Sequence, residues 1–209
     1  PGRLGEYLAA RIVLPAEDRR AAELAKSLFG ESRGNVSAQE HAVQDVNSPD
    51  AIEFVSQCAP DIVLVNGTNL VRREMLALKS RIRHGFINLH TGLSPYSRGG
   101  NCNLFMLLES RPELVGITIH YIDLGIDRGD IIQSAQTPMD AADNYEMIEL
   151  RGFHRGIETL LESARRVAAG KANRVRQWEK GKLFLQRTGY VYRPYHRVVV
   201  NRMLRNGLV

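Results

Sequence analysis

Two short apolar runs, separated by a segment with a helical pattern, constrain the fold of this 209-residue chain more than any other feature. The first is DIVLV at 61–65, a continuous β-branched run typical of a strand buried on both faces of a parallel sheet. The second is GFINLH at 85–90, and residues 71–80 between the runs are predicted to be helical. Because this alternation is typical of βαβ units, the sequence predicts an α/β protein with a doubly wound, mostly parallel sheet.

Start and stop signals predict two helices in the first third of the chain. One begins at Pro15 and ends at Gly30. The other has Ser48 as its N-cap and Pro49 at its first helical position, and it ends before Pro60. Both helices are expected to cover the predicted sheet.

The second half of the chain continues with strands and one long helix. Residues 115–123 and 129–139 are predicted to be strands joined by a tight loop that contains glycine. Asp143 and Glu146 have the spacing of a capping box. A helical stripe of apolar residues then continues to Gly170, which is expected to end the helix.

The remaining segments are less regular. Residues 39–46 are interpreted as a short strand, and the basic, aromatic residues 171–209 as a strand pair followed by a short amphipathic helix. We therefore expect one α/β domain at 1–170 and a short basic C-terminal extension at 171–209. The extension either packs on the domain or forms an oligomer contact.

Composition excludes several classes of protein. The content of 44% apolar and 24% charged residues is that of a soluble globular chain, and no apolar stretch approaches the length of a membrane span. Cys58 and Cys102 are too few for a disulfide framework and lie in segments predicted to be packed, so we expect reduced thiols and a cytoplasmic protein without a membrane partner. The net charge of +5 favours an anionic substrate or a weak nucleic-acid partner.

Candidate chemistry gathers where the second apolar run ends in Asn88 and His90. Residues two apart on a strand point to the same face, and ligands of open parallel sheets bind beyond the carboxyl ends of the strands. An imidazole transfers protons near neutral pH, and an amide donates to a developing oxyanion without titrating, so the pair suits attack on a carbonyl. Taken alone, so short a pattern favours a strand-end histidine and ordinary turn residues. The segment DLGIDRGD offers three carboxylates as partners: Asp123, Asp127 and Asp130.

The pattern around these residues is longer than a single motif. NLH at 88–90 is followed by LSP at 93–95, RG at 98–99 and GITIHYIDLGIDRGDII at 116–132. In order and spacing it resembles the 10-formyltetrahydrofolate-dependent formyltransferase family, and looks most similar to the small sugar N-formyltransferases. That family has an Asn-x-His-Pro-Ser-Leu-Leu-Pro segment, a Gly-x-Thr-x-His strand and a loop ending in Asp-x-Gly. The resemblance runs from about 61 to 132 and implies a Rossmann-like fold and 10-formyltetrahydrofolate as formyl donor.

The resemblance also implies roles for individual residues. Asn88, His90 and Asp127 would be catalytic: the first two would hydrogen-bond the formyl oxygen as an amine attacks, and Asp127 would orient His90 and help to move the proton. His120 matches another recurrent position and is at least as well explained as a packed strand residue. The resemblance further implies a pterin pocket lined by two segments. The residues expected to bind there are Gly67, Thr68, Leu70, Arg72, Asp123, Leu124 and Ile126.

Two departures from the family concern the acceptor. Residues 91–95 read TGLSP where the family has Pro-Ser-Leu-Leu-Pro, and no counterpart of the family's first strand is found before Glu17. We therefore expect the first strand–helix unit to be either absent or rebuilt, and the loop shape and acceptor contacts to differ from those of the family. Arg98 and Asn101 are candidates for acceptor contacts, and they are equally well explained by ordinary loop and helix-cap chemistry.

The favoured acceptor is the primary amine of a small, anionic, nucleotide-linked amino sugar. Glycinamide ribonucleotide and methionyl-tRNA are alternatives, although the residues after Gly170 are too few for a large tRNA-binding domain, which disfavours a nucleic-acid partner. The aromatic tail is interpreted first as a homodimer surface and then as a nucleotide contact. Two other classes stay open, a formyltetrahydrofolate hydrolase and a non-catalytic folate- or nucleotide-binding protein. No metal is expected, because compact ligand spacing such as His-x-x-x-His is absent.

Overall fold

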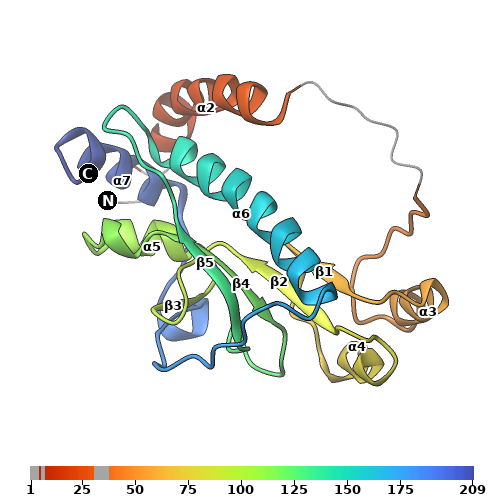
Figure 1. Cartoon of the computed structure of the whole chain (residues 1–209). Coiled ribbons are helices and arrows are strands. Elements are labelled where there is room, and N and C mark those ends of the chain that lie inside the picture. The colour runs from red at the N-terminus through yellow and green to blue at the C-terminus, as the bar shows by residue number, and fades with distance from the viewer. Residues whose placement is uncertain (1–4, 6–7, 31–37) are drawn as a thin grey trace.

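The computed structural model describes Gly5, residues 8–30 and residues 38–209. A four-stranded sheet with the order β1-β2-β4-β5 lies at its centre (Figure 1). β1 and β2 run parallel, whereas β4 lies antiparallel to both β2 and β5. The predicted α/β class is confirmed, and within the described sheet the parallel pairing occupies the β1–β2 half. The strands are β1 (Val63–Val65), β2 (Phe86–His90), β4 (Gly116–Tyr121) and β5 (Ile131–Gln136).

β1 and β2 differ in burial although both come from apolar runs. β2 is an inner strand, and residues on both of its faces are buried. β1 is an edge strand of the described sheet, and Leu64 is 41% exposed. The prediction that residues 61–65 are buried on both faces is therefore wrong, because β1 has only one neighbouring strand in the described part of the chain.

Helix α6 (Tyr145–Ala168) covers one face of the sheet (Figure 1). Ile87 and Leu89 of β2 point toward it and pack in one cluster with Leu160. A Cβ at Gly156 would lie 2.7 Å from Leu89 Cδ1, so the glycine lets the helix approach the strand closely.

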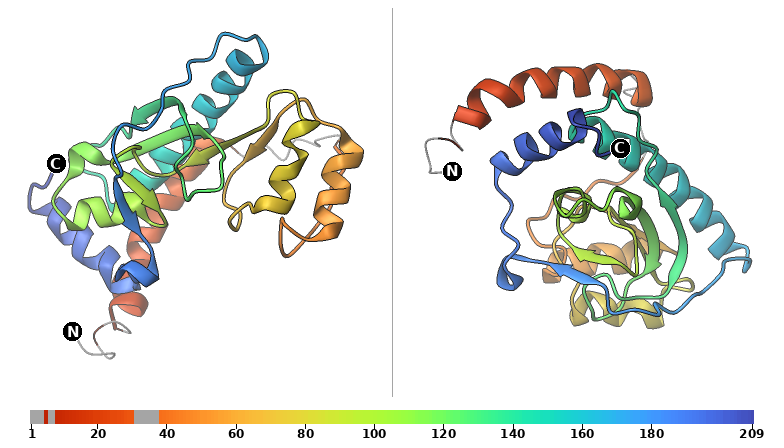
Figure 2. Two further views of the ribbon diagram at one scale, coloured as in Figure 1. Left: turned by 90° about the horizontal axis from the view of Figure 1, so that it is seen from below. Right: turned by 90° about the vertical axis from the view of Figure 1, so that its left-hand side faces the viewer.

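The other face of β2 carries Phe86, which packs with shorter helices. These are α3 (Pro49–Cys58), α4 (Arg73–Leu76) and the 3₁₀ helix η2 (Ala77–Ser80), seen together in the left view of Figure 2. The segment predicted to be helical at 71–80 thus forms the short α-helix α4, which continues into the 3₁₀ helix η2. Since Asn88 and His90 alternate in phase with Phe86, they share this second face.

α3 starts at Pro49 and ends at Cys58, before Pro60, as predicted. Ser48 Oγ accepts a hydrogen bond from Ala51 N at 3.1 Å, and Pro49 occupies the first turn, which confirms the N-cap. Cys58, at the end of the helix, is exposed, so the prediction that both cysteines are packed holds only for Cys102. The described helices include none with the length and apolar character that a bilayer crossing needs.

The N-terminal part contains one regular helix. A π-helical turn, η1 (Ala9–Val13), leads into α2 (Leu14–Phe29), and Gly30 N closes the helix on Lys26 O as predicted. Residues 39–46 form no strand: 39–44 are exposed, and no described strand lies beside them. The strand prediction was wrong because apolar alternation over so short a segment does not provide a pairing partner.

The long helix α6 begins one residue later than the capping-box pattern predicted. Its N-cap is Asn144, whose Oδ1 accepts from Met147 N at 2.8 Å. Asp143 instead pairs with Arg151 at 3.0 Å, and Glu146 pairs with Arg197 of the last helix. The two carboxylates of the predicted box are therefore used in ion pairs.

The C-terminal segment packs against the loop and helix that follow β2. β6 (Lys182–Phe184) pairs in parallel with β3 (Ser97–Gly99), so the strand pair predicted within the tail is wrong: the partner strand comes from another part of the chain. Helix α7 (Pro194–Arg205) confirms the predicted amphipathic helix, and it shares a core with α5 (Cys102–Leu108). Two further 3₁₀ turns are η3 (Pro112–Leu114) and η4 (Gln186–Thr188).

Candidate active site

The antiparallel pairing of β2 and β4 places Asn88 opposite His120. Asn88 Nδ2 lies 3.2 Å from His120 Nε2, and His120 Nδ1 lies 2.9 Å from Tyr121 O. A carbonyl only accepts hydrogen bonds, so His120 Nδ1 carries a proton. The Asn88 amide directs one N–H toward this ring and keeps a second N–H for another partner.

Asp127 joins the two histidines. Its Oδ2 lies 3.5 Å from His90 Nδ1 and its Oδ1 lies 3.5 Å from His120 Nε2. Gly99 N donates to Oδ2 at 2.9 Å, which ties the carboxylate to β3. The structure thus brings together the three residues expected to be catalytic, and it adds His120 to them.

A close turn delivers Asp127 to this position. Asp127 has a φ of 47°, in the left-handed region that aspartate and asparagine tolerate better than most residues. A Cβ at Gly129 would lie 1.6 Å from Tyr121 O, so only glycine fits where the loop folds back onto β4.

The surroundings set the charge states of His90 and Asp127. Burial lowers the pKa of His90, and the nearby Asp127 only partly offsets this, so the ring is neutral at neutral pH. Burial alone would raise the pKa of Asp127, but the proximity of His120 and His90 and the hydrogen bond from the Gly99 N–H together hold this pKa at about 2. The site therefore pairs an ionised carboxylate with a neutral imidazole.

The His90 ring is arranged to accept a proton. Its Nε2 lies 3.3 Å from Ser97 O, and its Nδ1 faces the Asp127 carboxylate. Both partners are acceptors, and a neutral imidazole has only one N–H to donate. Protonation supplies the second N–H, so these two oxygens stabilise the imidazolium when it forms.

These groups line a cavity of about 520 Å³, a size typical of small-molecule sites. Of the residues expected around the pterin, Gly67, Thr68, Leu70 and Ile126 line it. Asp123 and Leu124 line a neighbouring cleft, and Arg72 is exposed before α4, where its N–H donates to Asn47 Oδ1 at 2.6 Å. Of the seven residues expected around the pterin, four therefore line the catalytic cavity and two line the neighbouring cleft. Arg72 lines neither space.

Sequence reasoning missed several residues of this cavity, among them Asn66, Phe153 and Leu185. Asn66 lines it and donates to Leu89 O at 3.2 Å. A polar residue at the carboxyl end of a strand was a usable signal, the same one that marked Asn88. Phe153 and Leu185 line the cavity from distant parts of the chain and carried no comparable signal.

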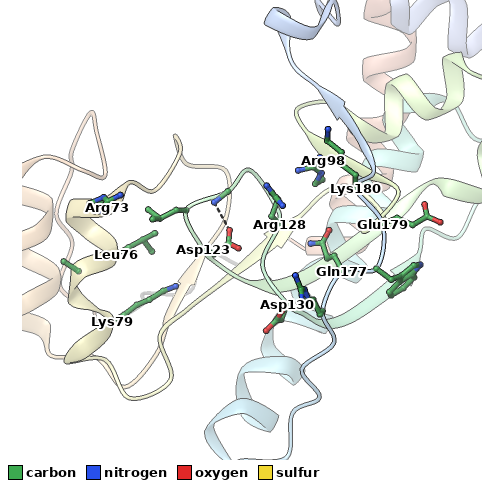
Figure 3. Close-up of a pocket in the computed structure, with 15 residues that line it drawn as sticks. Arg73, Leu76, Lys79, Arg98, Asp123, Arg128, Asp130, Gln177, Glu179 and Lys180 are labelled. Carbon is green, nitrogen blue, oxygen red and sulfur yellow. Dashed lines mark hydrogen bonds between the residues drawn. The ribbon is translucent and has the colours of Figure 1, made fainter.

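The neighbouring cleft has a volume of about 990 Å³ and is rich in cations (Figure 3). Arg98 and Lys180 lie close to Arg128, with Arg73 across the cleft on α4. Arg98 is only 5% exposed, and its Nε has no hydrogen-bond partner among the described residues. The cleft is therefore suited to an anionic group. Its cationic lining residues are Arg73, Lys79, Arg98, Arg128, Arg176 and Lys180.

The two residues expected to contact the acceptor are not brought together. Arg98 faces the basic cleft, whereas Asn101 lines a third cavity of about 510 Å³. The backbone turns between them, at Gly99 with a φ of 99° and at Asn101 with a φ of 53°, and so directs the two side chains apart. Asn101 begins α5 without a side-chain capping bond.

Comparison with known proteins identifies the family to which this fold and this site belong. Residues 9–163, more than half of the chain, match the family model described as "Formyl transferase". The chain therefore belongs to the formyl transferase family.

Known relatives differ in their acceptors. The methionyl-tRNA formyltransferase of Chlorobium chlorochromatii is 30% identical over 132 residues, which cover 63% of this chain and 41% of the relative. A 4-N formyltransferase from Francisella tularensis has a TM-score of 0.56 at 19% identity, covering 79% of this chain and 61% of its own. A formyltransferase from Anoxybacillus kamchatkensis has a TM-score of 0.52 at 19% identity, covering 84% of this chain and 92% of its own. The chain thus spans less than half the length of the curated relative, and the solved structures show the shared fold.

Proposed function

We propose that this protein transfers a formyl group from 10-formyltetrahydrofolate to the primary amine of a small nucleotide-linked amino sugar. The observation that carries the proposal is the convergence of Asn88, His90 and Asp127 on one wall of a 520 Å³ cavity. An amide donor, a neutral imidazole and an ionised carboxylate are the groups that amine attack on a formyl carbonyl requires.

The cavity fits the expected donor. It combines apolar walls from Val71, Ile122 and Phe153 with amides at Asn66 and Asn88, as a flat heteroaromatic ring with polar edges requires. When bound, 10-formyltetrahydrofolate supplies the activated formyl carbonyl. We propose this cavity for the pterin, as expected from the family resemblance, and Gly67, with a φ of 63°, provides a permissive backbone there.

Asn88 and His90 act on the formyl oxygen. As the amine nitrogen adds to the formyl carbon, negative charge develops on this oxygen, and the free N–H of Asn88 donates to it. His90 takes up the proton that the amine loses, because Ser97 O and Asp127 both stabilise the imidazolium. It then donates this proton to the oxygen and onward to the departing nitrogen. Asp127 positions the ring throughout.

The acceptor is proposed from two observations. The Anoxybacillus kamchatkensis enzyme with the same fold was solved with UDP-4,6-dideoxy-4-formamido-L-AltNAc and tetrahydrofolate. This chain in addition carries a basic cleft beside the catalytic cavity, and Gly125 lines both spaces. A nucleotide-linked amino sugar combines an amine with phosphates, which matches both features.

Methionyl-tRNA is the second candidate because the sequence relatives are methionyl-tRNA formyltransferases. The basic cleft also suits nucleic-acid phosphates. A panel of acceptors distinguishes the candidates: a UDP-linked 4-amino sugar, glycinamide ribonucleotide and methionyl-tRNA, each with 10-formyltetrahydrofolate. We expect formyl product on the amino sugar. Product on methionyl-tRNA alone would show that methionyl-tRNA, and not the amino sugar, is the acceptor. Release of formate without formylated amine would identify a hydrolase.

A further inference from the structure

The third cavity, of about 510 Å³, adjoins the catalytic cavity. Thr91 and Phe153 line both spaces, and Thr91 directly follows His90. Its other walls come from helices α2, α6 and α7 and from the loop before α5. A group bound here therefore lies next to the reacting end of β2, on the side of α6.

Glu149 of α6 is the unusual residue of this cavity. Its Oε1 is buried and has no hydrogen-bond partner among the described residues. A buried carboxylate oxygen without a donor is unfavourable, because the lost hydration is not replaced. An unpaired acceptor on a cavity wall is what a ligand with a donor group would satisfy.

The other charged groups on the cavity wall have ion-pair partners. Arg197 of α7 pairs with Glu146 and also with Asp18 of α2. Glu146 accepts a further hydrogen bond from Asn201 Nδ2 at 3.0 Å. Glu149 is left as the uncompensated charge, so the cavity favours a cationic donor over an anion.

We propose that Glu149 binds the amino group of the acceptor and positions it for attack on the formyl carbon. This inference rests on the proposed function and names the residue that recognises the reacting group. An ammonium ion donates a charge-assisted hydrogen bond to the unpaired oxygen. Tyr192, which is 41% exposed, and Phe153 provide aromatic surfaces for the sugar ring that carries this amino group.

The chemistry of Glu149 suits a further step. Burial raises its pKa to about 7, and hydrogen bonding from Asn103 and Tyr145 offsets only part of this. The carboxylate therefore takes one proton from the bound ammonium, giving a carboxylic acid and a neutral amine. No other atoms are exchanged, and the lone pair of the amine is freed for the formyl carbon.

The test compares Glu149→Gln with Glu162→Gln. Glutamine keeps the size of the side chain and removes its charge, and Glu162 is an exposed carboxylate on the same helix with a side chain 57% exposed. For Glu149→Gln we expect the KM for the acceptor to rise about 10- to 100-fold, while the KM for the formyl donor stays within about twofold. Glu162→Gln should change neither. Equal acceptor KM values for wild type and Glu149→Gln would overturn the proposal, as would a matching rise in the KM for the donor.

A binding experiment separates this proposal from the proposed function. Titration calorimetry compares the UDP-linked 4-amino sugar with UDP-N-acetylglucosamine, which lacks the free amine. Wild type should prefer the amine, and Glu149→Gln should lose that preference and keep its affinity for tetrahydrofolate. Amine preference without formyl transfer would support the Glu149 site and reject the proposed function. A wild type that binds none of the amines in the acceptor panel would overturn the site itself.

Discussion

Replacing Asp127 by asparagine removes the charge between two histidines with little change in shape. Asparagine tolerates the φ of 47° at this position, and its oxygen can still accept from Gly99 N. His90 loses the carboxylate that favours the protonated ring. We expect kcat to fall by about 10³- to 10⁴-fold, as in other sites where a carboxylate orients a catalytic histidine.

The same change has a stability signature that can be worked from the structure. Lowering the pKa of Asp127 from 3.8 to about 2 favours the ionised, folded state by about 2 kcal/mol. Because the folded pKa is depressed, wild type holds this contribution above about pH 4 and loses it as the pH falls toward 2. Asp127→Asn lacks the contribution at every pH.

Urea unfolding measured from about pH 6 to about pH 2, which covers the window in which this contribution is lost, checks the prediction. The free energy of unfolding of wild type should exceed that of Asp127→Asn near neutrality, and the two should converge in acid. A variant that keeps kcat within about tenfold of wild type, or a stability gap that widens in acid, would refute the reasoning.

Three further predictions concern single residues. His90→Ala should lower kcat by at least about 10²- to 10³-fold in steady-state assays while leaving the circular dichroism spectrum unchanged; an active variant would exclude His90 from the chemistry. Gly129→Ala should destabilise the protein by more than about 3 kcal/mol, because its Cβ would meet Tyr121 O at 1.6 Å, and a wild-type melting temperature would contradict this. Asn144→Ala should cost about 1–2 kcal/mol in urea unfolding, since it removes the N-cap of α6 and a hydrogen bond to Glu17 at 2.7 Å; an unchanged midpoint would show that neither contact matters.

The sequence correctly predicted those structural elements that depend on neighbouring residues alone. Ser48 followed by Pro49 starts α3 because a side-chain acceptor and a fixed φ act within one turn. The strand that ends in Asn88 and His90 was predicted for a similar reason, since alternation alone places both side chains on one face.

Long-range pairing explains most of what sequence reasoning missed. β6 pairs with β3, more than eighty positions earlier in the chain, and neither segment carries a signal for the other. Residues 39–46 were predicted to be a strand and have no pairing partner among the described strands. The capping box failed because Asp143 and Glu146 have arginine partners that only the folded chain brings near.

The candidate site likewise contains residues that sequence signals predicted and residues that only the folded chain reveals. Asn88, His90 and Asp127 were found from the strand end and the family pattern, and the structure brings them together. Arg98 and Asn101 were grouped because they are close in sequence, whereas the backbone turns between them and directs them into different spaces. Glu149 could not be found from sequence, since an unpaired oxygen is a property of its folded surroundings.

The most direct test of the central claim is a single-turnover experiment with wild type and His90→Ala in parallel. Excess protein is mixed with 10-formyltetrahydrofolate and the UDP-linked 4-amino sugar, and tetrahydrofolate and formylated sugar are quantified together. We predict that wild type forms both products in equal amounts and that His90→Ala forms neither on the same timescale. Tetrahydrofolate release without formylated sugar, or equal product from wild type and variant, would contradict the account.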